Sequence, residues 1–124
     1  MIITEDFVSF ETAKLLREKG FEGKMHTFYT ENGTEMESSY VVPSNFFPIY
    51  RPTLQMAMKY LREVHNIFIV IEPHVYDSIN EKTSSYVASL WQGDNYYENI
   101  GSKDYPTHEE ACDAVIKYCL ENLI

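Results

Sequence analysis

Residues 52–72 read PTLQMAMKYLREVHNIFIVIE and predict a helix followed directly by a strand. In the first part, from Leu54 to Val64, apolar residues recur at the three- and four-residue spacing of one helix face. Asn66 is a residue type that can end a helix in the left-handed conformation. We expect a strand over residues 67–72, and because its first five residues are all apolar it should be covered on both faces at the centre of a sheet.

Two more helices are predicted near the ends of the chain. Ser9 is a suitable N-cap for the first, which Gly20 ends. The last helix runs to the C-terminus from a capping box, in which Thr107 and Glu110 each satisfy the other's end of the backbone.

Two hairpins are predicted from turn residues. Asn32-Gly33 lies between two alternating segments, residues 24–30 and 35–42. A two-residue turn there pairs Tyr29 with Met36.

The second hairpin has its turn at Gly93-Asp94, between residues 84–91 and 95–101. Its register places Trp91 opposite Tyr96.

Prolines are expected to interrupt regular structure at two places. Residues 43–52 contain three prolines with aromatic residues between them, which predicts a loop packed on the body of the protein. Pro73 is expected to break or bulge the strand before it.

The chain of 124 residues fits one domain, residues 1–124. Hairpins with intervening helices indicate the α+β class. We expect one antiparallel sheet of about five strands with three helices mainly on one face, in the order α-β-β-α-β-β-β-α.

Charge and apolar content exclude several kinds of partner. Ten lysines and arginines against nineteen acidic residues give a net charge of −9, which disfavours binding to nucleic-acid phosphates. The element order from residue 52 onward is that of double-stranded-RNA-binding domains. Such domains grip phosphates with lysines at the start of the last helix, where this chain has Glu109 and Glu110. We therefore expect no nucleic acid as a partner.

The sequence also predicts a cytoplasmic protein without a membrane partner. The longest apolar run, residues 67–71, is far too short to span a bilayer. The first residues do not have the pattern of a secretory signal.

No residue pattern predicts a catalytic, metal or cofactor site. His108 and Cys112 share one helix face, but zinc needs three or four ligands, and Cys119 lies too far along the helix. We expect both cysteines to be small buried residues. The cluster His65, Glu72, His74 and Asp77 matches no ligand spacing, and we interpret it as solvated ends of elements. Catalysis is not predicted, although residues distant in sequence can still assemble an acid–base pair.

Aromatic residues with a polar end are the remaining feature. The chain has ten tyrosines and one tryptophan, and Trp91, Tyr96 and Tyr97 gather at the second hairpin. Such residues are enriched in binding surfaces and also pack across strands. These three are the candidate binding residues.

Three helical stretches resemble a family of small uncharacterised proteins of Bacteroides and their phages or mobile elements. They are VSFETAKLLREKGF (8–21), PTLQMAMKYLREVHNI (52–67), and EEA (109–111) with IKYCLENLI (116–124). The resemblance implies a bacterial or phage cytosol and carries no activity.

Three functions remain open at this point. The first, which we favour, is a non-catalytic module that binds a protein or a second copy of itself through the aromatic hairpin or the sheet face away from the helices. The second is an acidic decoy for a basic protein, and the third is a small enzyme with an unrecognised site. An enzyme would have a deep pocket holding titratable groups with shifted pKa values.

Overall fold

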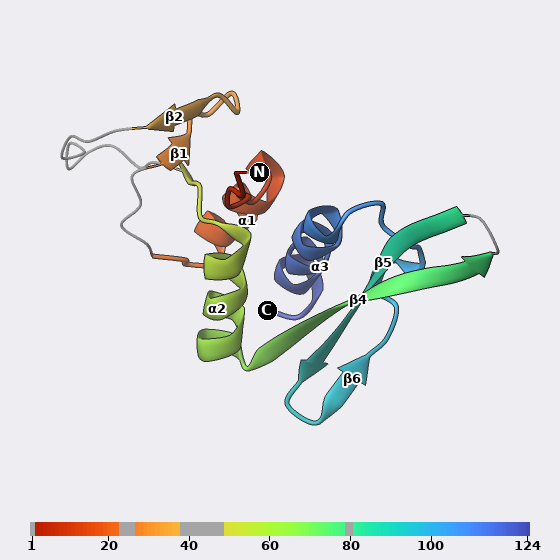
Figure 1. The fold of residues 1–124 in the computed structure, drawn as a ribbon. Helices are drawn as coiled ribbons and strands as arrows, with labels where there is room; N and C mark the ends of the chain where they lie inside the picture. Colours follow the sequence, from red (N-terminus) through yellow and green to blue (C-terminus); the bar gives the residue numbers. More distant parts are fainter. Residues whose placement is uncertain (1, 23–26, 38–48, 79–80) are drawn as a thin grey trace.

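A computed structural model describes residues 2–22, 27–37, 49–78 and 81–124, and Figure 1 shows how their helices and strands are arranged. The helices are α1 (Phe10–Glu18), α2 (Leu54–His65), the 3-10 helix η1 (Ile100–Ser102) and α3 (His108–Asn122). The strands are β1 (Thr27–Tyr29), β2 (Glu35–Glu37), β3 (Ile49–Tyr50), β4 (Ile67–Ser78), β5 (Glu81–Gln92) and β6 (Asn95–Tyr97). The α+β class is confirmed.

The strands form two three-stranded antiparallel sheets, in the orders β2-β1-β3 and β4-β5-β6. The expectation of one sheet of about five strands is therefore wrong. β3 occupies two residues between the prolines at 48 and 52, a segment predicted as a loop, and it pairs with β1. Two residues without a proline ring are enough for this short ladder, because both retain the backbone N–H. Residues 43–48 of the predicted proline-rich loop lie outside the described residues.

The hairpin of β1 and β2 is shifted by one residue from the predicted register. Tyr29 lies opposite Glu35 rather than Met36. A two-residue turn would need positive φ at both Asn32 and Gly33, but only Gly33 has it, at +88°. The backbone N–H of Gly33 donates to the carbonyl of Thr30 at 2.9 Å, so the loop has three residues. The Asn32 side chain accepts from the backbone N–H of Thr34 at 3.4 Å.

β4 lies at the edge of its sheet, and β5 is the central strand. Both the central placement of residues 67–72 and the break at Pro73 are therefore wrong: β4 continues through Pro73 in twelve successive pairs with β5. Opposite Pro73, Tyr86 exchanges backbone hydrogen bonds of 2.8 and 2.7 Å with Tyr105. The backbone of Tyr86 thus points away from β4, and the nitrogen of Pro73 faces the open edge. Proline costs no ladder hydrogen bond at that position.

α1 and α3 begin after the predicted caps, Ser9 and Thr107, and α2 begins after Thr53, for which no cap was predicted. The side chains of Ser9, Thr53 and Thr107 each accept a backbone N–H of the first turn, and Asn66 ends α2 with φ +56°. α2 and α3 pack on one face of the β4–β5–β6 sheet, and α1 packs on α3 (Figure 1). The largest fully buried apolar side chains come from all of these elements: Leu16, Leu61, Ile67, Leu90, Ile116 and Leu120. No helix in the described ranges is long and apolar enough to cross a membrane.

Candidate interaction surface

Three exposed aromatic side chains form a row across the β4–β5–β6 sheet. Phe68 on β4 lies opposite Trp91 on β5, and Trp91 lies opposite Tyr96 on β6. Their exposed fractions are 45%, 43% and 48%, and the rings of Trp91 and Tyr96 are 4.7 Å apart. Large apolar side chains exposed side by side are typical of interaction sites, whereas single ones are common on any surface. We call these three residues the aromatic row.

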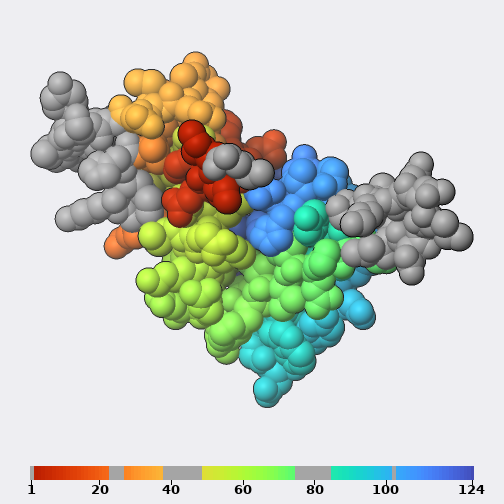
Figure 2. Space-filling view, in the orientation of Figure 1, coloured from red at the N-terminus to blue at the C-terminus, as the bar shows by residue number. Residues whose placement is uncertain are grey.

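The row faces away from the helices. Side chains of a strand alternate between its two faces, and the neighbours Ile67 and Leu90 are fully buried beneath α2 and α3. Figure 1 shows all three helices to one side of the sheet, and the turn between β5 and β6 forms the lower tip of the molecule in Figure 2. The α-helices therefore leave the aromatic row on the other face of this sheet exposed.

The structure separates the three predicted binding residues. The predicted pairing of Trp91 with Tyr96 is confirmed, and both side chains are exposed. Tyr97 lies opposite Leu90 and packs against the core, so it does not join the row. The third member of the row is Phe68, which was not among the predicted binding residues. Alternation within residues 67–71 places Phe68 on one face, but only the β4–β5 register brings it beside Trp91.

A shallow hollow of about 370 Å³ adjoins the row at Tyr96. It is lined by Glu72, His74, Val87, Ser89, Tyr96, Glu98, Asn99 and Asp104. These residues come from β4, β5, β6 and the segments on either side of η1, so the hollow exists only in the folded chain. Glu72 and His74, which are predicted to be solvated ends of elements, both line this hollow.

The polar groups near this hollow are arranged for structure rather than for nucleophilic attack. His74 Nδ1 donates to Asp104 Oδ2 at 2.8 Å, and the hydroxyl of Ser85 donates to the same oxygen at 2.8 Å. A nucleophilic serine must donate its hydroxyl hydrogen to an imidazole, which then removes the proton. Here Ser85 donates that hydrogen to the carboxylate, so these three side chains do not form a catalytic triad.

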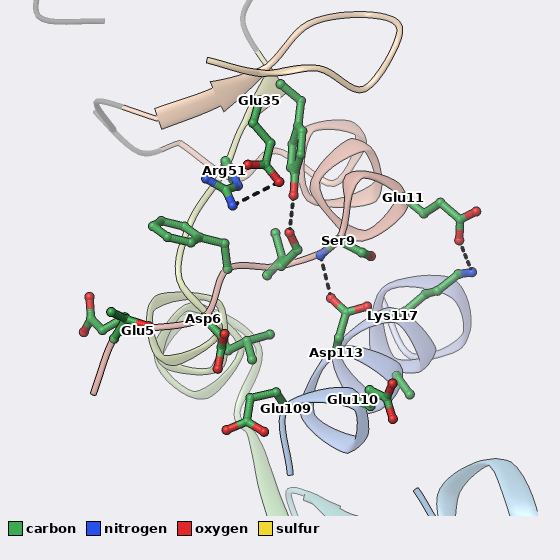
Figure 3. Close-up of a pocket in the computed structure, with 16 residues that line it drawn as sticks. Glu5, Asp6, Ser9, Glu11, Glu35, Arg51, Glu109, Glu110, Asp113 and Lys117 are labelled. Atoms are coloured by element: carbon green, nitrogen blue, oxygen red, sulfur yellow. Dashed lines mark hydrogen bonds and ion pairs between the residues drawn. The ribbon is translucent and has the colours of Figure 1, made fainter. Parts of the chain in front are cut away.

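A larger cavity, about 820 Å³, lies where the N-terminal segment meets α1, α2 and α3 (Figure 3). In Figure 2 this N-terminal segment, coloured red, lies above the junction of α2 and α3. Seven carboxylates line the cavity: Glu5, Asp6, Glu11, Glu35, Glu109, Glu110 and Asp113. Among the described residues, the cationic ones that line it are Arg51 and Lys117.

Both of these cations are already paired. Arg51 forms an ion pair of 3.3 Å with Glu35, and its guanidinium lies 4.0 Å from the centre of the Phe7 ring. Lys117 contacts Glu11 at 2.8 Å. This hydrogen bond and the attraction between the two charges lower the pKa of the Glu11 carboxyl and raise the pKa of the Lys117 ammonium.

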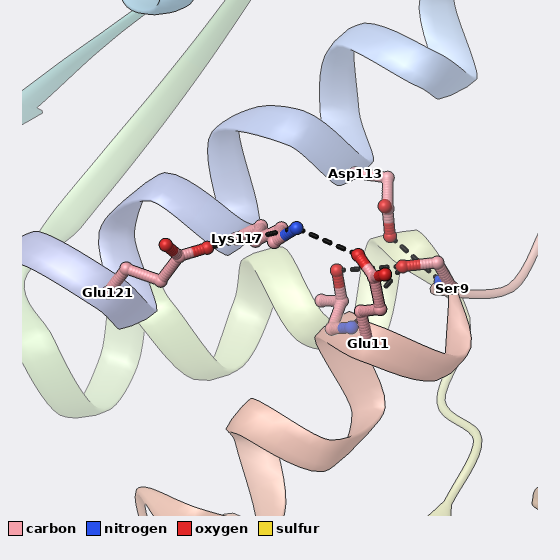
Figure 4. A network of polar contacts seen from close by, with 6 residues as sticks. Ser9, Glu11, Asp113, Lys117 and Glu121 are labelled. Atoms are coloured by element: carbon pink, nitrogen blue, oxygen red, sulfur yellow. Dashed lines mark hydrogen bonds and ion pairs between the residues drawn. The ribbon is translucent and has the colours of Figure 1, made fainter.

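Figure 4 shows how this network joins α1 to α3. Lys117 contacts Glu11 and, at 4.0 Å, Glu121, while Asp113 accepts the backbone N–H of Ser9 at 2.8 Å. The shifted pKa values in the cavity therefore come from an ion pair that connects two helices. They do not indicate an acid and a base facing a substrate.

The cysteines have the surroundings of structural residues. Burial raises the pKa of Cys112 to about 11 and that of Cys119 to about 12, so both thiols stay protonated at neutral pH. Cys112 Sγ lies 3.5 Å from His108 Nδ1. The prediction that both are buried is confirmed. Within the described ranges, no group of three histidine, cysteine or acidic residues is arranged to hold a metal ion.

Comparison with known proteins supplies no relative: no family model, curated protein or solved structure matches this chain.

Proposed function

We propose that this chain is a non-catalytic protein-interaction module that binds another protein through the open face of the β4–β5–β6 sheet. The observation that carries the proposal is the aromatic row, Phe68, Trp91 and Tyr96, exposed across three neighbouring strands. Tryptophan and tyrosine provide much of the binding energy in protein interfaces, because they bury large areas at little entropic cost.

The partner in this proposal is a different protein with a basic surface. A symmetric contact between two copies brings the same patch of both chains together. Two acidic patches, each with Glu72 and Glu98 beside the row, would then share one interface, between chains that each carry a net charge of −9. Like charges at an interface are unfavourable, whereas a basic partner is attracted. Charge complementarity therefore favours the basic partner over a second copy.

The resemblance in the three helices directs the search for this partner to Bacteroides. We propose a cytoplasmic role in such a cell or in a phage or mobile element that it carries. An acidic protein that occupies the binding surface of a basic protein would fit that setting.

The experiment uses the full chain as bait in a Bacteroides lysate. Three forms are compared: wild type, the double variant Trp91→Ala with Tyr96→Ala, and a control double variant, Met56→Ala with Val64→Ala. The control removes two exposed apolar side chains from α2, which lies on the other side of the sheet. We expect wild type and control to capture the same protein and the row variant to lose it.

The captured protein is then purified and titrated into the chain. Trp91 is the only tryptophan, so the change in its emission on selective excitation reports directly on the row. A saturable change at one-to-one stoichiometry is expected with a partner that lacks tryptophan or is labelled with a tryptophan analogue. Capture that survives in the row variant would contradict the proposal. Light scattering that shows a wild-type dimer, and a monomer for the row variant, would make a second copy the occupant.

A further inference from the structure

We infer that the partner presents an arginine to the hollow beside Tyr96, together with apolar side chains that cover the aromatic row. This inference rests on the proposed function and names the chemistry of the segment that the sheet face recognises. The row and the hollow share Tyr96, so one bound segment can contact both.

The spacing of the face suits an extended segment. Trp91 and Ser89 are two residues apart on β5, so both lie on the same face of the sheet. Trp91 is exposed in the row, whereas Ser89 is buried at the floor of the hollow, where its hydroxyl accepts the backbone N–H of Asn99 at 3.3 Å. Alternate residues of any strand are separated by about 7 Å. An extended partner chain along β5 therefore places one side chain over Trp91 and the next but one over Ser89. An apolar residue fits the first position, and a cationic residue fits the second.

The negative charge of the hollow favours a cationic group as its ligand. Asp104 already accepts hydrogen bonds from His74 and Ser85. Glu72 and Glu98 are exposed, and within the described part of the chain neither forms a hydrogen bond or an ion pair. Among the described residues that line the hollow, none is lysine or arginine. A bound guanidinium would thus meet two carboxylates without an internal partner.

The choice of arginine over lysine follows from the ring beside those carboxylates. A planar guanidinium can stack on the face of a tyrosine and donate two parallel hydrogen bonds to a carboxylate, which a lysine ammonium cannot do. One arginine of the protein itself combines ring contacts with a single contact to a carboxylate. Arg51 lies against the rings of Phe7 and Tyr29, at 4.0 and 5.5 Å, while it pairs with Glu35.

The test titrates three synthetic peptides into the full chain and follows the emission of Trp91. The first is acetyl-Arg-Leu-Arg-Leu-Arg-amide, the second replaces each arginine by citrulline, and the third replaces each by lysine. Citrulline keeps the shape and most hydrogen bonds of arginine without its charge. We expect saturable binding of the arginine peptide, roughly tenfold weaker binding of the lysine peptide, and weaker binding still of the citrulline peptide.

A pair of matched variants locates the arginine. Glu72→Gln with Glu98→Gln removes two charges from the hollow, and Glu18→Gln with Glu63→Gln removes two exposed charges from α1 and α2. Each surface carboxylate contributes a factor of about two to five. The hollow variant should therefore weaken the arginine peptide about four- to twenty-five-fold, and the helix variant less than about twofold. All four residues are exposed, so we expect both variants to fold.

Three results would overturn the inference: no saturable change with the arginine peptide, equal binding of the citrulline peptide, or equal binding by the hollow and helix variants. These failures are distinct from a failure of the proposed function. If the row variant loses a purified partner while the arginine peptide does not bind, the face is a docking site that recognises a different chemistry.

Discussion

Gly101 in η1 illustrates how a single position depends on its neighbours. It has φ +81°, a conformation that side chains disfavour, and the phenolic oxygen of Tyr105 occupies the place that a β-carbon would take. That hydroxyl donates to the carbonyl of Ile100 at 3.2 Å in a buried contact. Glycine fits here for two reasons: it adopts the left-handed backbone conformation without strain, and it leaves room for the ring of Tyr105.

Gly101→Ala should therefore lower the free energy of unfolding by about 2–4 kcal/mol, the sum of left-handed strain and a steric clash. Gly20→Ala is the matched control. Gly20 has φ +88°, but no atom lies within 4 Å of the added carbon, so we expect a loss of about 1 kcal/mol. Urea unfolding followed by Trp91 emission measures both. Equal losses in the two variants would show that Tyr105 does not restrict position 101.

At the scale of elements, β4 is an open edge with a proline in its middle. The nitrogen of Pro73 faces that edge because Tyr86, opposite it, directs its backbone to Tyr105. Proline cannot donate to an added strand, which is one way in which natural sheets avoid pairing at their edges. Because its nitrogen faces the open edge, Pro73 costs β4 no hydrogen bond within the sheet. For the same reason, its ring prevents an added strand from pairing at that position.

Replacing Pro73 by valine restores an N–H to the open edge. We expect Pro73→Val to self-associate with increasing concentration, while the monomer keeps its fold. Light scattering coupled to gel filtration measures the mass, and Pro106→Val, at an exposed proline outside the strands, serves as the control. A monomer for both variants at all concentrations would show that other features protect this edge.

For the whole molecule, α3 connects the two sheets. It packs on β4, β5 and α2, and its Lys117 and Asp113 hold the start of α1. On the other side, the hydroxyl of Tyr29 on β1 donates to the backbone of Val8 at 2.6 Å. These contacts predict that both sheets unfold together as one domain.

Leu61→Ala tests this cooperativity from the centre of the core, where the side chain is fully buried on α2. Removing it should cost about 2–5 kcal/mol of unfolding free energy. Trp91 emission reports on the β4–β5–β6 sheet, and far-ultraviolet circular dichroism reports on the helices. We expect the two urea transitions to coincide in wild type and to shift together in the variant. Separate transitions would mean two independent folding units.

Local sequence accounts for the features whose causes are close along the chain. The caps Ser9, Thr53 and Thr107 and the left-handed Asn66 are set by side chains within one helical turn of the groups they satisfy. The pairing of Trp91 with Tyr96 follows from a two-residue turn in the same way. Two of the three residues of the aromatic row, Trp91 and Tyr96, are predictable for this reason.

The tertiary structure decided the features whose causes are distant along the chain. Strand order, the separation into two sheets and the edge position of β4 depend on which backbone groups meet across long loops, and apolar pattern alone does not distinguish an edge from a centre. Phe68 joins the row only through the β4–β5 register, and the hollow needs Asp104 brought beside His74, thirty residues earlier in the chain. The sequence by itself thus determined the helices, their caps and one hairpin, because those interactions are local. Long-range packing decided which face of the sheet is open, and with it the candidate interaction surface.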